Sequence, residues 1–116
     1  MIIEFDFLPT SVNQCFATNW NTRRRFKTKK YAEFIARMMP ILTGLVKEPL
    51  KGDLEVEYNF YFPDKRRRDV FNLEKAMSDT LVLYGVIEDD SQIVRGTVEK
   101  AYDKGKPYTV VEIKKL

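Results

Sequence analysis

The chain contains no histidine, and only one cysteine occurs among its 116 residues. Without histidine, imidazole acid–base catalysis and histidine metal sites are excluded, so any metal is expected to be held by oxygen ligands. The single cysteine, Cys15, excludes an intrachain disulfide and fits a reducing compartment, so we expect a cytoplasmic protein. No apolar run approaches the roughly 20 residues of a membrane helix. Residues 1–6 carry acids where a signal peptide needs bases, so we expect no membrane association.

The basic residues are clustered, although the net charge of +3 is small. Six of the eight residues from Arg23 to Lys30 are basic, and residues 65–68 are all basic. Such clusters favour a polyanionic partner such as nucleic acid, whereas the alternative is two solvated loops. The residues predicted to bind DNA are Arg23, Arg24, Arg25, Lys27, Lys29, Lys30, Arg66, Arg67 and Arg68.

Aromatic residues are interleaved with the first basic cluster and with the polar residues before it, which predict a loop. These aromatic residues are Phe16, Trp20, Phe26 and Tyr31. They could stack on nucleotide bases or pack the loop onto the core, and we favour packing.

Hydrophobic periodicity predicts one domain over residues 1–116, with elements in the order β-α-β-α-β-β. Pro40 is expected to kink the first helix, to split it, or to begin a second one. A glycine-containing loop at 102–106 predicts a hairpin between the last two strands. The predicted strands cover 2–8, 54–62 with a possible bulge or strand end near Phe60, 92–101 and 107–113. The predicted helices cover 29–46 and 69–84. The fold class is α+β (mixed α/β), with a mixed or antiparallel sheet of about four strands and two main helices.

The second predicted helix carries polar residues along one flank of its apolar face. At about 100° per residue, Asn72, Lys75 and Asp79 span about 60°, and Asp69 lies within about 60° of Asn72. A flank of this kind could form a site on a rigid helix, or it could be the solvated edge of an amphipathic helix. Asp69 by itself is more often a helix cap than a ligand.

Carboxylates beside arginines suggest phosphodiester chemistry. Two aspartates, Asp69 and Asp90, could hold Mg²⁺ and leave room for water and phosphate oxygens. Lys75 could stabilise the transition state or protonate the leaving oxygen. The arginines at 66–68 could clamp flanking phosphates.

The same residues resemble a known family. The run Arg68-Asp69-x-x-Asn72-Leu73-x-Lys75-Ala76-x-x-Asp79-x-Leu81, followed by Gly85-Val86 and Asp89-Asp90-Ser91-Gln92-Ile93, looks like the RusA-type Holliday junction resolvases. The segment Pro9-Thr10-Ser11-Val12-Asn13 and the closing Pro107-x-Thr109-Val110-Val111-x-Ile113 are also similar. The resemblance covers most of the chain.

The resemblance implies a homodimeric endonuclease that uses Mg²⁺ or Mn²⁺ to make paired nicks across four-way DNA junctions in recombination and repair. The resemblance leaves a phage, a prophage and a cellular origin of this chain open. The resemblance assigns catalysis to Asp69, Lys75 and Asp90, and metal binding to Asp69, Asp90 and Asp89. It gives Asn72 and Asp79 supporting roles.

Phe71 departs from the family pattern, because it stands where a second aspartate is usual. The remaining acids could suffice to hold the metal, the metal could bind weakly and leave low activity, or the protein could bind junctions without cutting them. We favour retained metal-dependent cleavage. The alternatives are a DNA-binding protein without chemistry and a structural module whose acids are solvated caps.

Overall fold

The fold is a four-stranded sheet with two helices on one face and a separate two-stranded hairpin. The computed structural model describes residues 1–103 and 105–116. The elements are β1 (Ile2–Phe5), the 3₁₀ helix η1 (Val12–Gln14), β2 (Phe16–Asn19), β3 (Arg24–Lys27), α1 (Lys29–Leu42), β4 (Leu54–Phe62), α2 (Val70–Leu83), the 3₁₀ helix η2 (Asp90–Gln92), β5 (Ile93–Tyr102) and β6 (Tyr108–Lys115). The predicted α+β class and the order of its six main elements are confirmed, and β2 and β3 are additional strands.

The main sheet is mixed, with strand order β1-β6-β4-β5. β5 runs parallel to β4, whereas β6 is antiparallel to both β4 and β1. The predicted hairpin between the last two strands is therefore wrong, because β4 lies between them. α2 carries the chain from β4 to the parallel strand β5, so the other edge of β4 remains for β6. The loop that joins β5 to β6 includes Lys104, which lies outside the described residues.

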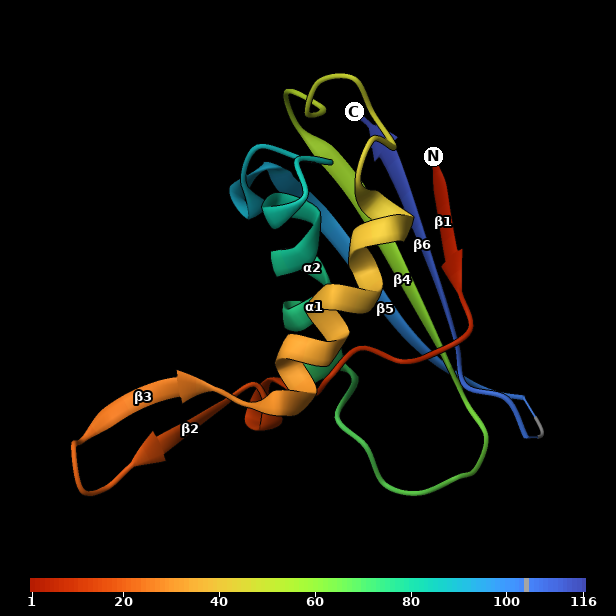
Figure 1. The fold of residues 1–116 in the computed structure, drawn as a ribbon. Helices are drawn as coiled ribbons and strands as arrows, with labels where there is room; N and C mark the ends of the chain where they lie inside the picture. Colours follow the sequence, from red (N-terminus) through yellow and green to blue (C-terminus); the bar gives the residue numbers. More distant parts are fainter. Residues whose placement is uncertain (104) are drawn as a thin grey trace.

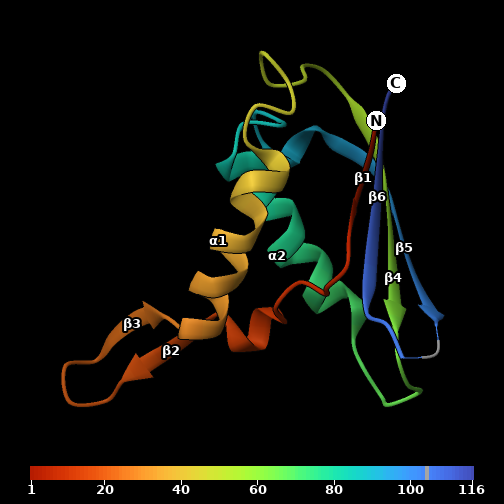
Figure 2. The same cartoon turned by 45° about the vertical axis from the view of Figure 1, so that its right-hand side comes forward.

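Figures 1 and 2 show α1 and α2 on the same face of this sheet, while the opposite face is left open. The core between the two layers is built on the alternation of β4. Its inward side chains are each at most 1% exposed: Leu54, Val56, Tyr58, Phe60 and Phe62. The predicted bulge after Phe60 is absent from β4, since the burial alternates through Phe62. The register shift of β4 lies instead between Leu54 and Glu55.

Both helices begin at the predicted caps. The Thr28 hydroxyl accepts a hydrogen bond from the Tyr31 N–H, and an Asp69 carboxylate oxygen accepts one from the Phe71 N–H at 3.0 Å. α1 ends at Leu42, earlier than predicted, and Pro40 lies inside its last turn. Gly85 follows α2 with φ 73°, the left-handed conformation that glycine adopts without strain. The caps thus fix where α2 starts and stops.

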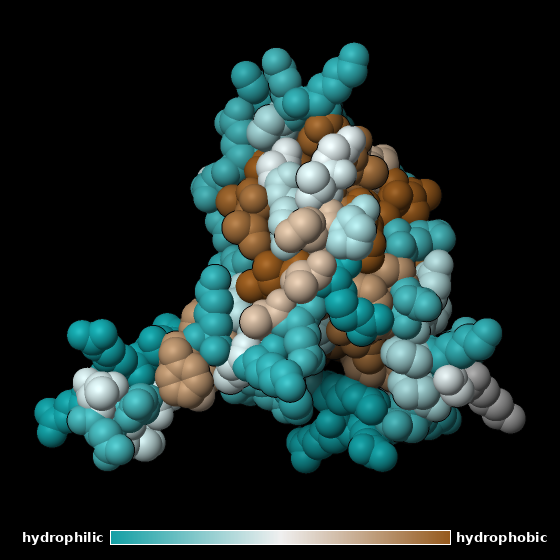
Figure 3. All heavy atoms as spheres, viewed as in Figure 1, coloured by the Kyte–Doolittle hydropathy of each residue, from teal (hydrophilic) through white to brown (hydrophobic). Residues whose placement is uncertain are grey.

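The segment predicted as a basic loop contains the β2–β3 hairpin, which projects from one end of the molecule (Figure 1). The basic loop between β4 and α2 lies at that same end, and both chain termini lie at the other (Figures 1 and 2). Figure 3 shows this end as mostly hydrophilic surface. Within the described ranges, neither helix is long and apolar enough to cross a membrane.

Candidate active site

The predicted acids lie in two hollows along α2. The first, called here the cleft, is lined by Asp69 and Asn72 together with α1 and the segment after β1. The second, called the acidic hollow, is lined by Lys27, Tyr31, Ile35, Asp79, Val82, Leu83, Asp89 and Asp90. Periodicity placed Asp69 and Asn72 near one another, and the structure keeps these two together. It assigns Asp79 to the other hollow.

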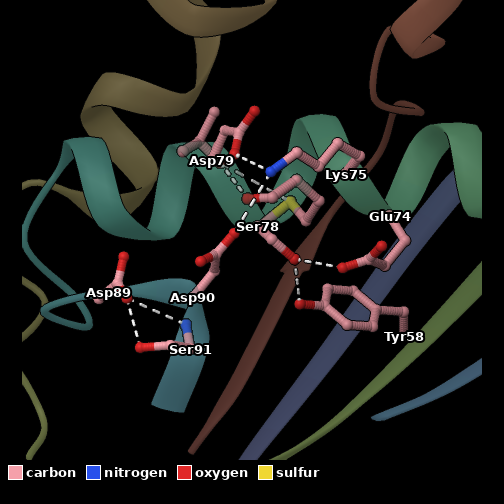
Figure 4. A network of polar contacts seen from close by, with 10 residues as sticks. Tyr58, Glu74, Lys75, Ser78, Asp79, Asp89, Asp90 and Ser91 are labelled. Carbon is pink, nitrogen blue, oxygen red and sulfur yellow. Dashed lines mark hydrogen bonds and ion pairs between the residues drawn. The ribbon is translucent and has the colours of Figure 1, made fainter. Parts of the chain in front are cut away.

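Lys75 links α2 to the second acidic segment of the sequence. Its ammonium nitrogen lies 3.1 Å from a carboxylate oxygen of Asp79 and 3.3 Å from one of Asp90 (Figure 4). The Asp79 contact follows from the i,i+4 spacing on a helix, whereas the Asp90 contact depends on the packing of η2 beside α2. The hydrogen bond to Asp79, and then that to Asp90, raises the pKa of Lys75. This lysine therefore stays charged at neutral pH.

Asp89 is positioned as the cap of η2. Its carboxylate accepts hydrogen bonds from the Ser91 hydroxyl and from the Ser91 N–H, the latter at 3.3 Å. The Gln92 side chain accepts in turn from the Asp89 N–H, which completes a capping box. The bonds from Ser91 lower the pKa of Asp89, so this carboxylate is ionised beside Asp90 at neutral pH.

A buried chain of hydrogen bonds holds the middle of α2 against the sheet. The Tyr58 hydroxyl from β4 contacts the Ser78 hydroxyl at 2.5 Å, and Ser78 donates to Glu74 at 2.6 Å (Figure 4). Burial raises the pKa of Tyr58, so its phenol remains protonated and donates to Ser78. Ser78 follows Lys75 on α2 by less than one helical turn. The hydrogen bonds of Ser78 therefore also fix the position of Lys75 relative to the sheet.

The cleft brings two separate sequence motifs together. Ser11 and Asn13, from the segment after the first strand, line it together with Asp69 and Asn72. Arg37 also lines the cleft, and sequence analysis did not select it. The sequence could have indicated Arg37, because it follows Lys30 by seven residues and therefore falls on the same helix face. Its guanidinium lies 3.7 Å from the centre of the Phe7 ring.

The basic residues before α2 are partly ordered by an acid of their own loop. Asp64 accepts a hydrogen bond from Arg68 at 2.8 Å and lies 3.6 Å from Arg66. The Arg68 side chain also lies over the Phe62 ring, 4.6 Å from its centre. The hydrogen bond from the Arg68 side chain, and then that from the Arg66 N–H, lowers the pKa of Asp64. Arg67 is exposed.

The remaining predicted DNA-binding residues lie near the hairpin and the start of α1. Arg23, Arg24, Arg25 and Lys27 belong to the hairpin and are exposed, and Lys30 lines the cleft. Lys29 pairs instead with Glu33 on its own helix at 3.8 Å.

The chemistry of the donors fits a hard divalent cation, because the acidic hollow offers three carboxylates and neither thiolate nor imidazole. Their arrangement is looser than a closed site. Among residues 1–103 and 105–116, no three acidic or cysteine side chains are grouped closely enough to hold one ion. Asp69 lines the cleft and not the acidic hollow, so the three predicted metal ligands do not surround one point within a single chain.

Phe71 is exposed in the first turn of α2, with 66% of its surface accessible. Its ring therefore contributes little to the core. This is the position at which the family resemblance predicts an acid.

Comparison of the sequence with known proteins gives matches to a single family. The family model described as Endodeoxyribonuclease RusA matches residues 6–114. A crossover junction endodeoxyribonuclease RusA of Escherichia coli strain K12 is 31% identical over 93 residues, which cover 79% of this chain and 76% of that protein. The protein of the same name from Enterobacteria phage 82 gives the same identity and coverage. One from Aquifex aeolicus is 30% identical over 74 residues, which are 60% of this chain and 59% of that protein.

Proposed function

The chain belongs to the endodeoxyribonuclease RusA family, and we propose that it is a divalent-metal-dependent nuclease that resolves four-way DNA junctions by paired nicks. The relatives are named as crossover junction endodeoxyribonucleases, which supports the junction as substrate. The biological role proposed from this substrate is DNA recombination and repair.

The observation that carries the proposal is the ammonium group of Lys75 between the carboxylates of Asp79 and Asp90. A cation fixed by two acids on the face of a rigid helix can stabilise negative charge that develops on a phosphoryl group. Its raised pKa favours this role over proton donation, because a general acid works best when its pKa is near the working pH. Lys75, Asp90 and Asp69 are the proposed catalytic residues.

Asp90 and Asp89 would hold Mg²⁺ or Mn²⁺ at the acidic hollow, since Mg²⁺ is commonly bound by one or two carboxylates and completed by water and phosphate oxygens. When bound, the ion supplies an activated water and neutralises phosphoryl charge. Asp69 is the third carboxylate of the proposal. The contribution of Asp69 to cleavage is tested separately, because Asp69 lines the cleft.

The basic residues would bind the DNA arms on either side of this site. Arg68 is ordered by Asp64, which presets its position for a phosphate. The exposed Arg66 and Arg67 and the hairpin residues would add contacts that depend on ionic strength. Paired nicks require two sites related by a two-fold axis, so we propose a homodimer. A sedimentation measurement that gave a monomer at micromolar concentration, with or without junction, would contradict paired cleavage.

The direct test is to incubate the protein with a synthetic four-way junction and Mg²⁺ or Mn²⁺. We expect symmetric nicks in two opposite strands and none in a duplex of the same sequence. EDTA should abolish the nicks and leave binding intact. No nicks at a concentration that saturates the junction would refute the nuclease.

A protein that binds junctions without cutting them is the second candidate, and the exposed Phe71 is the observation that favours it. Phe71→Asp and Phe71→Asn discriminate, because they are similar in size and differ in charge. An acid in the first turn of a helix is also compatible with the helix dipole, so neither variant should unfold α2. Magnesium binding by calorimetry and nicking that appear only in Phe71→Asp would assign the wild-type chain to the non-cutting class.

A further inference from the structure

The β2–β3 hairpin carries the most exposed large apolar side chain of the described residues, the indole of Trp20, which is 83% exposed. The strands pair from Phe16↔Lys27 to Asn19↔Arg24, so Trp20 begins the turn at the far end of the hairpin. The Asn19 side chain accepts hydrogen bonds from the N–H groups of Asn21 and Thr22, at 3.0 and 3.4 Å. These bonds order the turn. Trp20 is therefore held at the tip of a projecting element (Figure 1).

The aromatic residues around the first basic cluster separate into two groups. Phe16 and Tyr31 pack together, with ring centres 5.5 Å apart, and Tyr31 is buried. For these two residues the predicted packing is confirmed. Trp20 and Phe26 are exposed, so packing does not account for them. An exposed indole held at the turn of a basic hairpin is placed where it can stack on a partner.

The charge around Trp20 identifies the chemistry of that partner. Residues 16–28 contain four basic residues, Arg23, Arg24, Arg25 and Lys27, and no acid. The Arg25 guanidinium already lies 4.0 Å from the centre of the Phe16 ring, which braces the base of the hairpin. A positive strip that ends in a flat aromatic side chain suits a polyanion with exposed aromatic faces, which is nucleic acid with unstacked bases.

The hairpin also starts beside the proposed site, since Lys27 of β3 lines the acidic hollow together with Asp79 and Asp90. A DNA strand at that hollow would thus continue along the hairpin. We propose that Trp20 stacks on an unstacked base at the branch point of the DNA, so that the hairpin distinguishes a junction from a duplex. This inference rests on the proposed function in taking branched DNA as the substrate and the acidic hollow as its site.

Stacking on Trp20 should favour branched DNA because a continuous duplex keeps its base faces covered, whereas the centre of a junction exposes them. The arginines of the hairpin bind phosphates, which both forms of DNA carry, so they should not discriminate. Loss of the indole should therefore weaken junction binding and leave duplex binding nearly unchanged. Loss of one hairpin arginine should weaken both equally.

The chain has a single tryptophan, so its intrinsic fluorescence reports on Trp20 alone. The experiment titrates the full chain, in EDTA, with a four-way junction and with a duplex of matched sequence. A 2-aminopurine at the branch point gives a second signal. We expect saturable quenching of Trp20 and a change in 2-aminopurine fluorescence with the junction only.

Variants then measure the contribution of the indole by a method that does not use tryptophan, such as anisotropy of labelled DNA. Trp20→Ala should lose about 10- to 100-fold in junction affinity and less than about 3-fold in duplex affinity. Trp20→Phe should recover most of the loss, because a phenyl ring also stacks. Met39→Ala is the matched control, since it truncates an exposed apolar side chain on α1, outside the hairpin.

Equal junction affinities for wild type and Trp20→Ala would overturn the inference, as would equal losses on junction and duplex. A blue-shifted response to anionic phospholipid vesicles without a response to the junction would also overturn it and indicate a membrane contact instead. The proposed nuclease function fails by a different result, namely a wild-type protein that binds the junction in this experiment but does not nick it with Mg²⁺.

Discussion

Asp69 combines two properties that substitutions can separate: a side-chain oxygen that caps α2 and a negative charge that lines the cleft. Its carboxylate accepts the Phe71 N–H at 3.0 Å, one of the backbone donors that the first turn cannot satisfy by itself. Asparagine caps helices as well as aspartate does, but it carries no charge. Alanine provides neither property. Comparing Asp69→Asn with Asp69→Ala therefore isolates the charge from the cap.

The expected stabilities follow from the single capping bond. Losing it in Asp69→Ala should cost about 1 kcal/mol of unfolding free energy. In a domain of this size that corresponds to a fall of about 4 °C in melting temperature. Asp69→Asn should stay within a few tenths of a kcal/mol of wild type. Urea denaturation followed by circular dichroism measures both.

The expected activities follow from the charge. If Asp69 contributes to metal binding or charge stabilisation during cleavage, both variants should nick the junction roughly 100-fold more slowly. Junction binding in EDTA should be unaffected. Wild-type cleavage by Asp69→Asn would leave Asp69 as a cap only and refute its proposed catalytic role. Equal destabilisation of the two variants would refute the cap.

Three further results are expected. Ser78→Ala should lower the free energy of unfolding by about 1–3 kcal/mol and Tyr58→Phe by about 1 kcal/mol, because Ser78→Ala leaves the buried Tyr58 hydroxyl without a partner. Urea denaturation of both variants and of the double variant measures these costs, and equal costs would contradict the prediction. The raised pKa of Lys75 means that its ion pairs stabilise the fold below the unfolded pKa of about 10.4 and cease to do so as pH rises through the folded value. The difference in stability between wild type and Lys75→Met should thus be small and constant from pH 7 to about 9.5, and should vanish only as the pH rises through the folded pKa, above about 10.4. A difference that grew with pH would be inconsistent. Gly85→Ala should cost about 1–2 kcal/mol in thermal unfolding through its left-handed backbone alone, since a Cβ there meets no atom within 4 Å, and a neutral result would refute that conformation.

The elements predicted well from sequence are those with one buried face. β4 alternates between core and solvent without interruption, so its predicted bounds of 54–62 match the structure. α2 has a recognisable cap at Asp69 and a glycine stop at Gly85, and both lie where expected. β2 and β3 have no buried residue, so no hydrophobic pattern marks them. Their pairing comes from backbone hydrogen bonds, which leave no signal in side-chain type.

The candidate site shows the same division between local and long-range information. The Lys75–Asp79 pair follows from helical spacing and was predictable. The Lys75–Asp90 pair and the separation of Asp69 from Asp90 depend on how η2 packs beside α2, which no local pattern specifies. Periodicity also placed Asn72 on one flank with Asp79, but only the structure shows that these two residues line different hollows.

The distribution of charge over the sheet determines the side from which DNA can approach. Glu4, Glu57 and Glu112 alternate with buried residues and so lie on the open face of the sheet, away from the helices. Glu57 and Glu112 are even direct partners across β4 and β6. The basic segments at 23–27 and 65–68 lie instead at one end of the molecule, beyond the helices (Figures 1 and 2). Phosphates are repelled by the first surface and attracted by the second, so the net charge of +3 understates the local field. This polarity would direct DNA toward the end that carries the hairpin, whose Lys27 also lines the acidic hollow of the proposed nuclease site.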